Sequence, residues 1–555
     1  MSQVRGGAGP VAAATPPPGK TQHPGIGTAA AVLMVGTILS RILGLVREQV
    51  TAYMFGTGDA VAAFTIADNI HTMLFDLVIS GMMQAALIPV LSEYAGKERR
   101  DELRSITGTL LTLSVLGVGA LVVIVEIFAP AAVQVMTRLG AADQVRSQEV
   151  VDLTIEMVRL ILPAVLLLSI STVLMATLYS LQRFTRPALS LAVRNAAIIF
   201  AALTLGRTAL EVRSLVIGIV LGAVLLIAIQ LPGLRDAMPR PNLNVRHPAI
   251  RRIYLLYLPI FLGLFANTFA LIVDRNLAWR VGENALGAMR FATTLNQMIL
   301  GLVAAAISLA ALPALSRHFS AGDEVAYRAT LARGLRMVTV LVVPAAFGLA
   351  VLSWPVVQLL FFHGATTEEG AELIWLALLL YLPGTLFAAF DQVLIFAYYA
   401  RQNTKIPQLV GVLAVAVYFG FALSLYRPFG MAGLVLANSA QFTFHGLIMI
   451  WLMRRLLAGE RLDNGELART LKVCTAVSVV MAAVAGLLAL GLSYGLPDMD
   501  GAGGLLRELL IVAVPVAVGA VIYAFGLFRY DIQEAVLIRT RVVSLAVGIR
   551  NLRSM

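Results

Sequence analysis

The chain has 555 residues, of which 59% are hydrophobic and 13% are charged, and its mean hydropathy is +0.85. Soluble domains carry about 25% charged residues, so this composition excludes an ordinary soluble protein and indicates one that crosses a membrane many times. The formal net charge of +11 would suit a nucleic-acid-binding protein, but its distribution along the chain argues against that class. Cys474 is the single cysteine, which excludes an intrachain disulfide and a cysteine-based metal site.

Long apolar runs fill most of the chain between two polar tails. Residues 1–27 are rich in Pro, Gly and Ala, lack the pattern of a signal peptide, and predict a disordered cytoplasmic tail. At about 20 residues per span, the runs predict an all-α polytopic membrane protein with about 14 transmembrane helices. The predicted segments are 28–50, 60–91, 106–129, 152–181, 187–206, 214–234, 253–279, 286–315, 335–361, 372–400, 407–426, 430–453, 471–494 and 505–528. Residues 529–555 predict a basic cytoplasmic tail, either a surface-lying amphipathic helix or an ordinary solvated segment.

Basic residues cluster in alternate loops of this arrangement. With the N-terminus placed in the cytoplasm, 29 of the 42 Lys and Arg residues fall on the cytoplasmic side and seven on the opposite side. Loops rich in Lys and Arg stay in the cytoplasm when a membrane protein inserts. The positive charge therefore predicts that both termini are cytoplasmic, and nucleic acid is not expected as a partner.

The chain resembles itself at a spacing of about 220–228 residues. Matched features include 87–92 with 311–316, Pro130 with Pro355, and Gln182 with Gln402. Because the repeat covers an even number of predicted spans, both copies run in the same sense through the bilayer, as in transporters with parallel repeats. The repeat predicts an N-lobe at 28–234 and a C-lobe at 253–453, joined by a cytoplasmic linker at 235–252, with two extra helices over 471–528.

Arginines inside the apolar segments are the strongest functional signal. An arginine at the bilayer centre costs between about 2.5 and 17 kcal/mol, depending on how the cost is obtained, so it normally faces a cavity or a partner. Six basic residues are assigned to neither side and lie within apolar segments: Arg41, Arg47, Arg159, Arg194, Arg275 and Arg290. The pairs Arg47-Glu48 and Asp274-Arg275 lie at matching depth in the first segment of each lobe, so we expect them to face a cavity between the lobes.

Guanidinium groups suit a phosphate or pyrophosphate because their planar donors bind its oxygens in pairs. We therefore predict an anionic ligand for Arg41, Arg47, Arg275 and, more weakly, Arg290. The alternative is that Arg41 and Arg47 form structural ion pairs with nearby carboxylates, or that Arg47 extends to the outer interface. Arg159 and Arg194 are interpreted as mainly structural.

Carboxylates and a histidine in the second segment are candidate partners for these arginines or coupling groups. Asp68 and His71 are neighbours on a helix, and Asp76 lies two turns beyond Asp68. Asp391 is a further candidate. Structural pairing is favoured for all of them over proton coupling. No nucleotide-binding loop, zinc-ligand spacing or serine-nucleophile elbow is found, so neither an enzyme nor a cofactor is predicted.

Several motifs resemble the MurJ/MviN lipid II flippase family of the multidrug/oligosaccharidyl-lipid/polysaccharide exporter superfamily. They are Ser40-Arg41-x-x-Gly44-x-x-Arg47-Glu48, Phe55-Gly56-x-Gly58, Ala86-Leu87-Ile88-Pro89-Val90-Leu91-Ser92-Glu93-Tyr94, Val273-Asp274-Arg275-x-Leu277-Ala278 and Leu312-Pro313-x-Leu315-Ser316. The resemblance covers about residues 28–528.

The resemblance implies a flippase of the bacterial cytoplasmic (inner) membrane. It would carry undecaprenyl-linked peptidoglycan precursor, lipid II, to the outer leaflet by alternating access. The family's cavity arginines fall on Arg41 and Arg47, and helices over 471–528 would line a groove for the lipid tail. Membrane lipids and cell-wall synthesis proteins are the expected partners. Two family features are missing: no arginine lies near Phe75-Asp76, and a second expected arginine falls on Thr294, with Arg290 one turn earlier.

The family's sodium-site aspartate falls on Asp274, with Asn438 as a remaining ligand candidate, while its other partners fall on Tyr418 and Ala422. A sodium site is therefore doubtful. Three alternatives stay open: an exporter of another lipid-linked glycan, a drug antiporter of the same superfamily, and a transport-inactive membrane scaffold for cell-wall enzymes. An antiporter for cationic drugs would favour acidic cavity residues, whereas these candidates are mainly basic.

Overall fold

A computed structural model describes residues 26–77, 86–138, 146–457, 463, 465–497 and 501–534 of the protein. Within these ranges the regular secondary structure is entirely helical, which confirms the predicted all-α class. Most of the two predicted tails, 1–27 and 529–555, lies outside the described residues.

The first half of the chain forms long helices with short helices between them. In chain order these are α1 (Ile26–Phe55), α2 (Asp59–Phe75), α3 (Ile88–Ser92), η3 (Lys97–Arg99), α4 (Arg100–Leu113), η4 (Ser114–Val118), α5 (Gly119–Ile127), α6 (Ala129–Arg138), α7 (Gln148–Ser180), α8 (Thr185–Leu205), α9 (Arg213–Gln230) and η5 (Leu231–Ala237). A non-helical stretch at 238–247 then leads to the second half.

The second half likewise consists of long helices with short helices between them. Its elements are α10 (Pro248–Val281), α11 (Ala285–Ile299), η6 (Leu300–Ala304), α12 (Ala305–Ser320), α13 (Glu324–Val351), α14 (Ser353–Phe361), α15 (Glu368–Ala400), α16 (Lys405–Leu456), α17 (Glu466–Gly495) and α18 (Ala502–Arg529). The elements η4 and η6 are single π-helical turns inside longer helices. Such turns often occur at functional sites.

Ten helices in the described ranges are long and apolar enough to cross a membrane. Each of the fourteen predicted segments overlaps at least one described helix, but the exact number of spans stays a prediction. The segments at 407–426 and 430–453 fall in α16, which is interrupted by non-helical backbone at Gly430.

One predicted segment, 335–361, is wrong as a single helix. The chain breaks at Leu352 into α13 and α14, because Pro355 has no N–H to donate to the carbonyl of Val351. The prediction also placed the start of the 106–129 segment too late, since polar residues from Lys97 onward extend that helix.

Matched turns in the two halves support the internal repeat. Before the paired prolines, Phe128 has φ −94° and ψ 18°, and Leu352 has φ −95° and ψ 10°. Gln182 and Gln402 end α7 and α15 with φ of 58° and 57°. In both turns the following N–H donates to the carbonyl five residues back, as in a Schellman cap, at 2.9 Å after Gln182 and 3.0 Å after Gln402.

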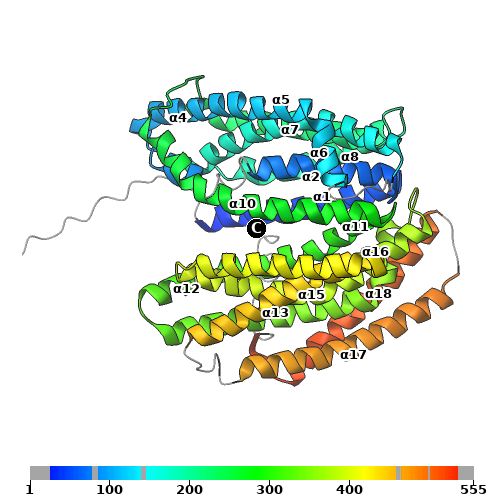
Figure 1. Ribbon diagram of the computed structural model, residues 1–555. Helices are drawn as coiled ribbons and strands as arrows, with labels where there is room; N and C mark the ends of the chain where they lie inside the picture. The colour runs from blue at the N-terminus through cyan, green and yellow to red at the C-terminus, as the bar shows by residue number, and fades with distance from the viewer. Residues whose placement is uncertain are drawn as a thin grey trace, which may run out of the picture.

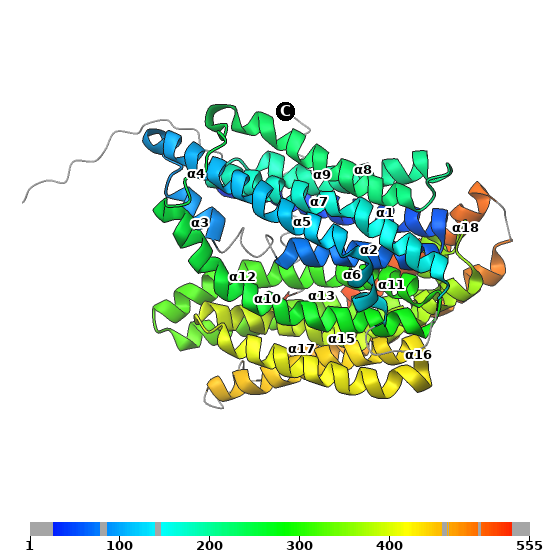
Figure 2. The ribbon, with the colours of Figure 1, turned by 45° about the horizontal axis from the view of Figure 1, so that its top comes forward.

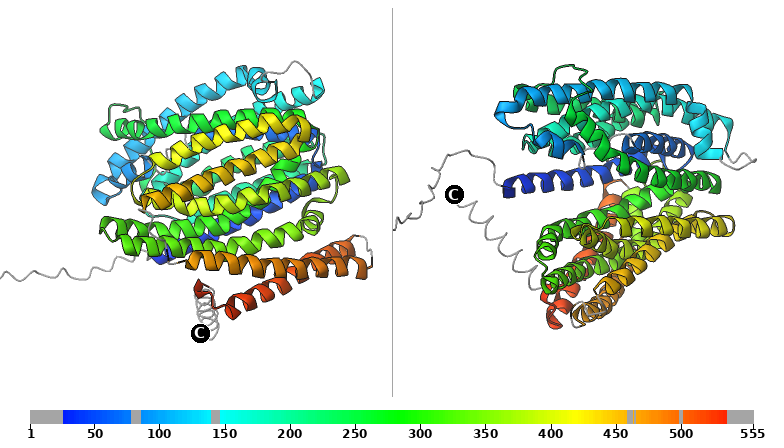
Figure 3. Two further views of the ribbon diagram at one scale, coloured as in Figure 1. Left: turned by 60° about the horizontal axis from the view of Figure 1, so that its bottom comes forward. Right: turned by 60° about the vertical axis from the view of Figure 1, so that its left-hand side comes forward.

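The helices form two groups that follow the order of the chain (Figure 1). Helices α1, α2, α4, α5, α7 and α8 lie in the upper group of Figure 1, and α12, α13, α15, α17 and α18 lie in the lower group. The tilted view shows the same division, with α9 in the upper group (Figure 2). Helices α10 and α11 lie between the groups, and α17 and α18 follow the outer edge of the lower one (Figures 1 and 3).

The two groups meet at one end of the helices, which we call the distal end (residues 56–58, 146–147, 282–284 and 362–367). There the Ala365 N–H donates to the Tyr53 carbonyl at 2.8 Å, and the Thr57 hydroxyl donates to Asn284 Oδ1 at 2.6 Å. The opposite ends of the helices, which carry the basic loops, form the proximal end. The largest apolar core includes side chains from both halves, among them Phe64 and Phe291.

Candidate functional site: charged residues between the helix groups

Helix α1 brings Arg47 and Glu48 into the interior of the protein. The Glu48 side chain is only 1% exposed. Arg47 Nε donates to Glu48 Oε1 at 3.1 Å, and Arg47 Nη1 donates to Asn195 Oδ1 of α8 at 3.2 Å. The amide of Asn195 in turn donates to the Ser40 carbonyl at 3.1 Å, so α8 orients the charged stretch of α1.

Arg290 of α11 joins the same carboxylate from the other side. Its Nε donates to Glu48 Oε2 at 2.9 Å, and its Nη1 donates to Asp68 Oδ2 of α2 at 3.0 Å. The guanidinium also lies over the Phe64 ring, 4.7 Å from its centroid. We call Arg47, Glu48, Asp68 and Arg290 the central cluster. It links α1 and α2 to α11 by charge-assisted hydrogen bonds.

His71 lies beside the central cluster, with its Nδ1 3.6 Å from Asp68 Oδ1, as the i,i+3 spacing predicts. Asp76 caps the end of α2 and interacts electrostatically with Arg194 of α8. Arg194 is half-buried against α9, where its backbone and side chain approach Gly222. The sequence-predicted acidic groups of α2 therefore face basic groups of neighbouring helices.

Arg275 and Asp274 form a separate pair on α10. Arg275 Nη1 lies 3.4 Å from Asp274 Oδ2, and the Tyr418 hydroxyl of α16 donates to Asp274 Oδ1. The two carboxylate oxygens of Asp274 thus face donor groups of the protein, the cationic Arg275 and the Tyr418 hydroxyl. This arrangement does not fit a sodium ion, which needs free oxygen ligands. In the described ranges no group of three or more His, Cys, Asp or Glu side chains could hold a metal.

Arg41 differs from the other arginines in its partner. Its Nη1 donates to the Gln297 carbonyl of α11 at 3.4 Å, and its guanidinium lies directly against Gly301 in the π-helical turn η6. A Cβ at position 301 would collide with that guanidinium, so glycine permits the approach. Among the described residues no carboxylate pairs with Arg41, which leaves its charge available to a ligand.

Two other predicted residues lie away from this region. Asp391 of α15 pairs with His445 of α16, with 2.7 Å between Oδ2 and Nδ1, inside the second helix group. Arg159 is exposed on α7 and lines a shallow surface hollow with Asp152 and Glu156.

Sequence reasoning missed two residues that shape the site and one that connects elements at the distal end. Asn195 orients Arg47, Gly301 accommodates Arg41, and Arg146 contacts both helix groups at the distal end. Asn195 was detectable as an amide inside an apolar run. Gly301 gave no signal, because the sequence does not reveal which side chain faces a glycine.

Comparison with known proteins identifies the family. The family model described as lipid II flippase MurJ matches residues 51–497. The lipid II flippase MurJ of Burkholderia cenocepacia is 27% identical over 430 residues, which cover 76% of this chain and 82% of the relative. The probable lipid II flippase MurJ of Haemophilus influenzae is 30% identical over 433 residues, which cover 74% and 83%.

Solved structures share the fold. A structure described as lipid II flippase MurJ in an inward closed conformation matches with a TM-score of 0.73 at 19% identity, over 90% of this chain and 99% of that one. An inward-facing MATE family multidrug resistance transporter of the MOP superfamily matches with a TM-score of 0.64 at 15% identity, over 78% and 98%. At these identities the likeness concerns the fold alone. Because the family model spans most of the sequence, this multi-pass membrane protein belongs to the lipid II flippase MurJ family.

Proposed function

We propose that the protein moves lipid II from the inner to the outer leaflet of the bacterial cytoplasmic membrane by alternating access. Family membership and the likeness to curated lipid II flippases support this proposal. The observation that carries it is the convergence of Arg47 of α1 and Arg290 of α11 on a single carboxylate. Two guanidinium groups so placed suit the oxygens of a pyrophosphate.

In this proposal Arg41, Arg47, Arg275 and Arg290 bind the pyrophosphate of the substrate. Arg41 is available for the first contact, since a backbone carbonyl is its partner. Glu48 lies between Arg47 and Arg290 and occupies the place of a ligand oxyanion. Exchange of Glu48 for a phosphate would keep both arginines paired and would loosen the link between the helix groups.

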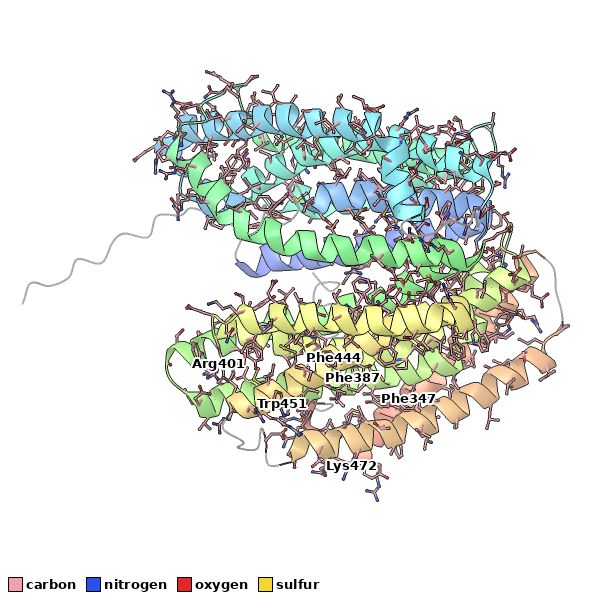
Figure 4. All side chains as sticks on the ribbon, in the orientation of Figure 1. Phe347, Phe387, Arg401, Phe444, Trp451 and Lys472 are labelled. Carbon is pink, nitrogen blue, oxygen red and sulfur yellow. The ribbon has the colours of Figure 1, made fainter. Side chains whose placement is uncertain are left out.

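The predicted lobes and groove complete the proposal. The N-lobe (28–234) and C-lobe (253–453) would move relative to each other, joined by the 235–252 linker, with the proximal end and both termini in the cytoplasm. Helices over 471–528 would hold the lipid tail. Apolar contacts support that role: Phe347 of α13, labelled in Figure 4, packs against an apolar cluster that includes Val477 of α17 and Tyr523 of α18.

Complementation of a strain depleted of its own lipid II flippase tests the proposal. We expect the wild-type chain to restore growth and Arg41→Ala to abolish rescue at equal membrane abundance, because the substrate loses its first cationic contact. Arg159→Ala is the matched control, since this arginine is exposed on α7, and it should rescue fully. Failure of the correctly inserted wild type, in a host with the same precursor, would contradict lipid II as substrate.

A further inference from the structure

Arg146 is a buried charged residue outside the proposed substrate site. It precedes α7 at the distal end, and its side chain is 1% exposed. Its guanidinium pairs with the Asp59 carboxylate at the start of α2, in its own helix group. It also lies 4.6 Å from the ring centroid of Trp279, on α10.

Arg146 reaches across to the turn between α10 and α11. Its Nη2 donates to the Gly282 carbonyl at 2.7 Å and to the Glu283 carbonyl at 3.1 Å, and its Nε donates to the Trp279 carbonyl at 3.4 Å. The last carbonyls of a helix have no partner within the helix and carry partial negative charge. Arg146 therefore caps the carboxyl end of α10 from another part of the chain.

The same turn takes part in close contacts at the distal end. Asn284 accepts the hydrogen bond of Thr57, and Thr57 also lies against Gly287 of α11 and Gly370 of α15. At either glycine a Cβ would collide with Thr57, so the two groups approach closely only because these positions lack side chains. Separation of the groups here would expose Thr57, which is 2% exposed.

We propose that Arg146 is a latch that holds the distal end closed, and that Asp59 positions it. Opening the distal end would take the guanidinium away from three carbonyls and leave the end of α10 uncapped. The positive charge stays paired with Asp59 in both states, so the cost of opening comes from the lost cap contacts. This latch acts on the conformational equilibrium and is separate from substrate binding by the central cluster.

Thiol labelling of position 57 tests the latch in the full chain without substrate. The parent carries Cys474→Ala, which removes the buried native cysteine, and Thr57→Cys as reporter. The purified protein in nanodiscs is exposed to a low concentration of a polar maleimide, so that the labelling rate follows the population of the open distal end. Size-exclusion profiles and thermal unfolding show whether each variant is folded.

We expect slow labelling of the parent and a rate about tenfold higher or more in Arg146→Gln, the change that corresponds to about 1.4 kcal/mol. Asp59→Asn should raise the rate less, because the cap contacts remain. Arg213→Gln is the matched control: it breaks an exposed ion pair between α7 and α9 within one group and should leave the rate unchanged.

If Arg146→Gln does not fold, Arg146→Lys replaces it, because it keeps the charge but cannot make the forked contacts to Gly282 and Glu283. Unchanged labelling in a folded Arg146 variant would overturn the latch, as would fast labelling of the parent. Neither outcome bears on lipid II as substrate, since conformation alone is measured.

Discussion

At the scale of single residues, the central cluster depends on one carboxylate that two arginines share. Glu48 is almost fully buried, and Arg47 and Arg290 each donate to it. An intact buried ion pair adds only modestly to the stability of the folded protein, because the cost of removing both charges from water offsets much of their attraction. Removing one partner is costly, since the other charge stays buried and unpaired.

Glu48→Gln should therefore destabilise the protein by about 3–5 kcal/mol, because Arg47 loses its charged partner and Arg290 keeps only Asp68. Thermal unfolding in detergent, followed by the loss of a monodisperse peak, measures the effect. Asp101→Asn is the control: its side chain is 93% exposed and pairs with Arg104 at the surface, where ion pairs contribute about 0–1 kcal/mol. Equal melting temperatures for the two variants would show that Glu48 is not a structural partner of the arginines.

The identity of these charged residues was readable from the sequence, but their pairing was not. Charges inside apolar runs are visible because the membrane makes them costly. Arg290 meets Glu48 across 242 residues of chain, and this contact depends on how two helix groups dock. Sequence reasoning therefore ranked Arg290 below Arg275, although Arg290 is the one that joins the central cluster.

At the scale of helices, the break in α16 occurs at a glycine, whose backbone can adopt a non-helical conformation. Gly430 divides α16 with φ 57° and ψ −131°, a conformation that side chains strongly disfavour, and a Cβ there would lie 3.2 Å from Val281 Cγ1. The sequence analysis predicted two segments here, 407–426 and 430–453.

Gly430→Ala should destabilise the protein by about 1–3 kcal/mol, because alanine is strained in this conformation. Gly420→Ala lies in the regular part of the same helix and faces open space. It should cause no loss of stability, since alanine has a higher helix propensity than glycine. Melting temperatures of the two variants against wild type give the comparison. A lower melting temperature for Gly420→Ala alone would contradict the role assigned to Gly430 at the kink.

The elements that sequence reasoning found are those with a strong local signal. Apolar runs and paired prolines placed the helices and the repeat, and the left-handed residues Gln182 and Gln402 agree with that repeat. The break at Leu352 was missed, because the run from 335 to 361 is mostly apolar and contains two prolines, of which Pro344 lies inside α13 and only Pro355 follows a break.

At the scale of the whole molecule, the basic loops gather at the proximal end, which we propose to be cytoplasmic. In a Cys474→Ala chain, Glu368→Cys at the distal end should react with an impermeant maleimide in intact cells. Ala321→Cys at the proximal end should react only after the cells are permeabilised. Both positions are exposed, so accessibility of the side chain is not limiting. The opposite pattern would reverse the proposed orientation.

The central cluster also has an electrical consequence. Arg47 and Arg290 carry two positive charges, and Glu48 and Asp68 carry two negative ones, so the paired group is neutral. A unit charge that crosses the membrane potential changes in energy by about 2.3 kcal/mol per 100 mV. The voltage exerts no net force on a neutral group that moves as one body. Arg41, whose hydrogen bond goes to the uncharged Gln297 carbonyl, stands outside this neutral group, so the voltage acts on its charge.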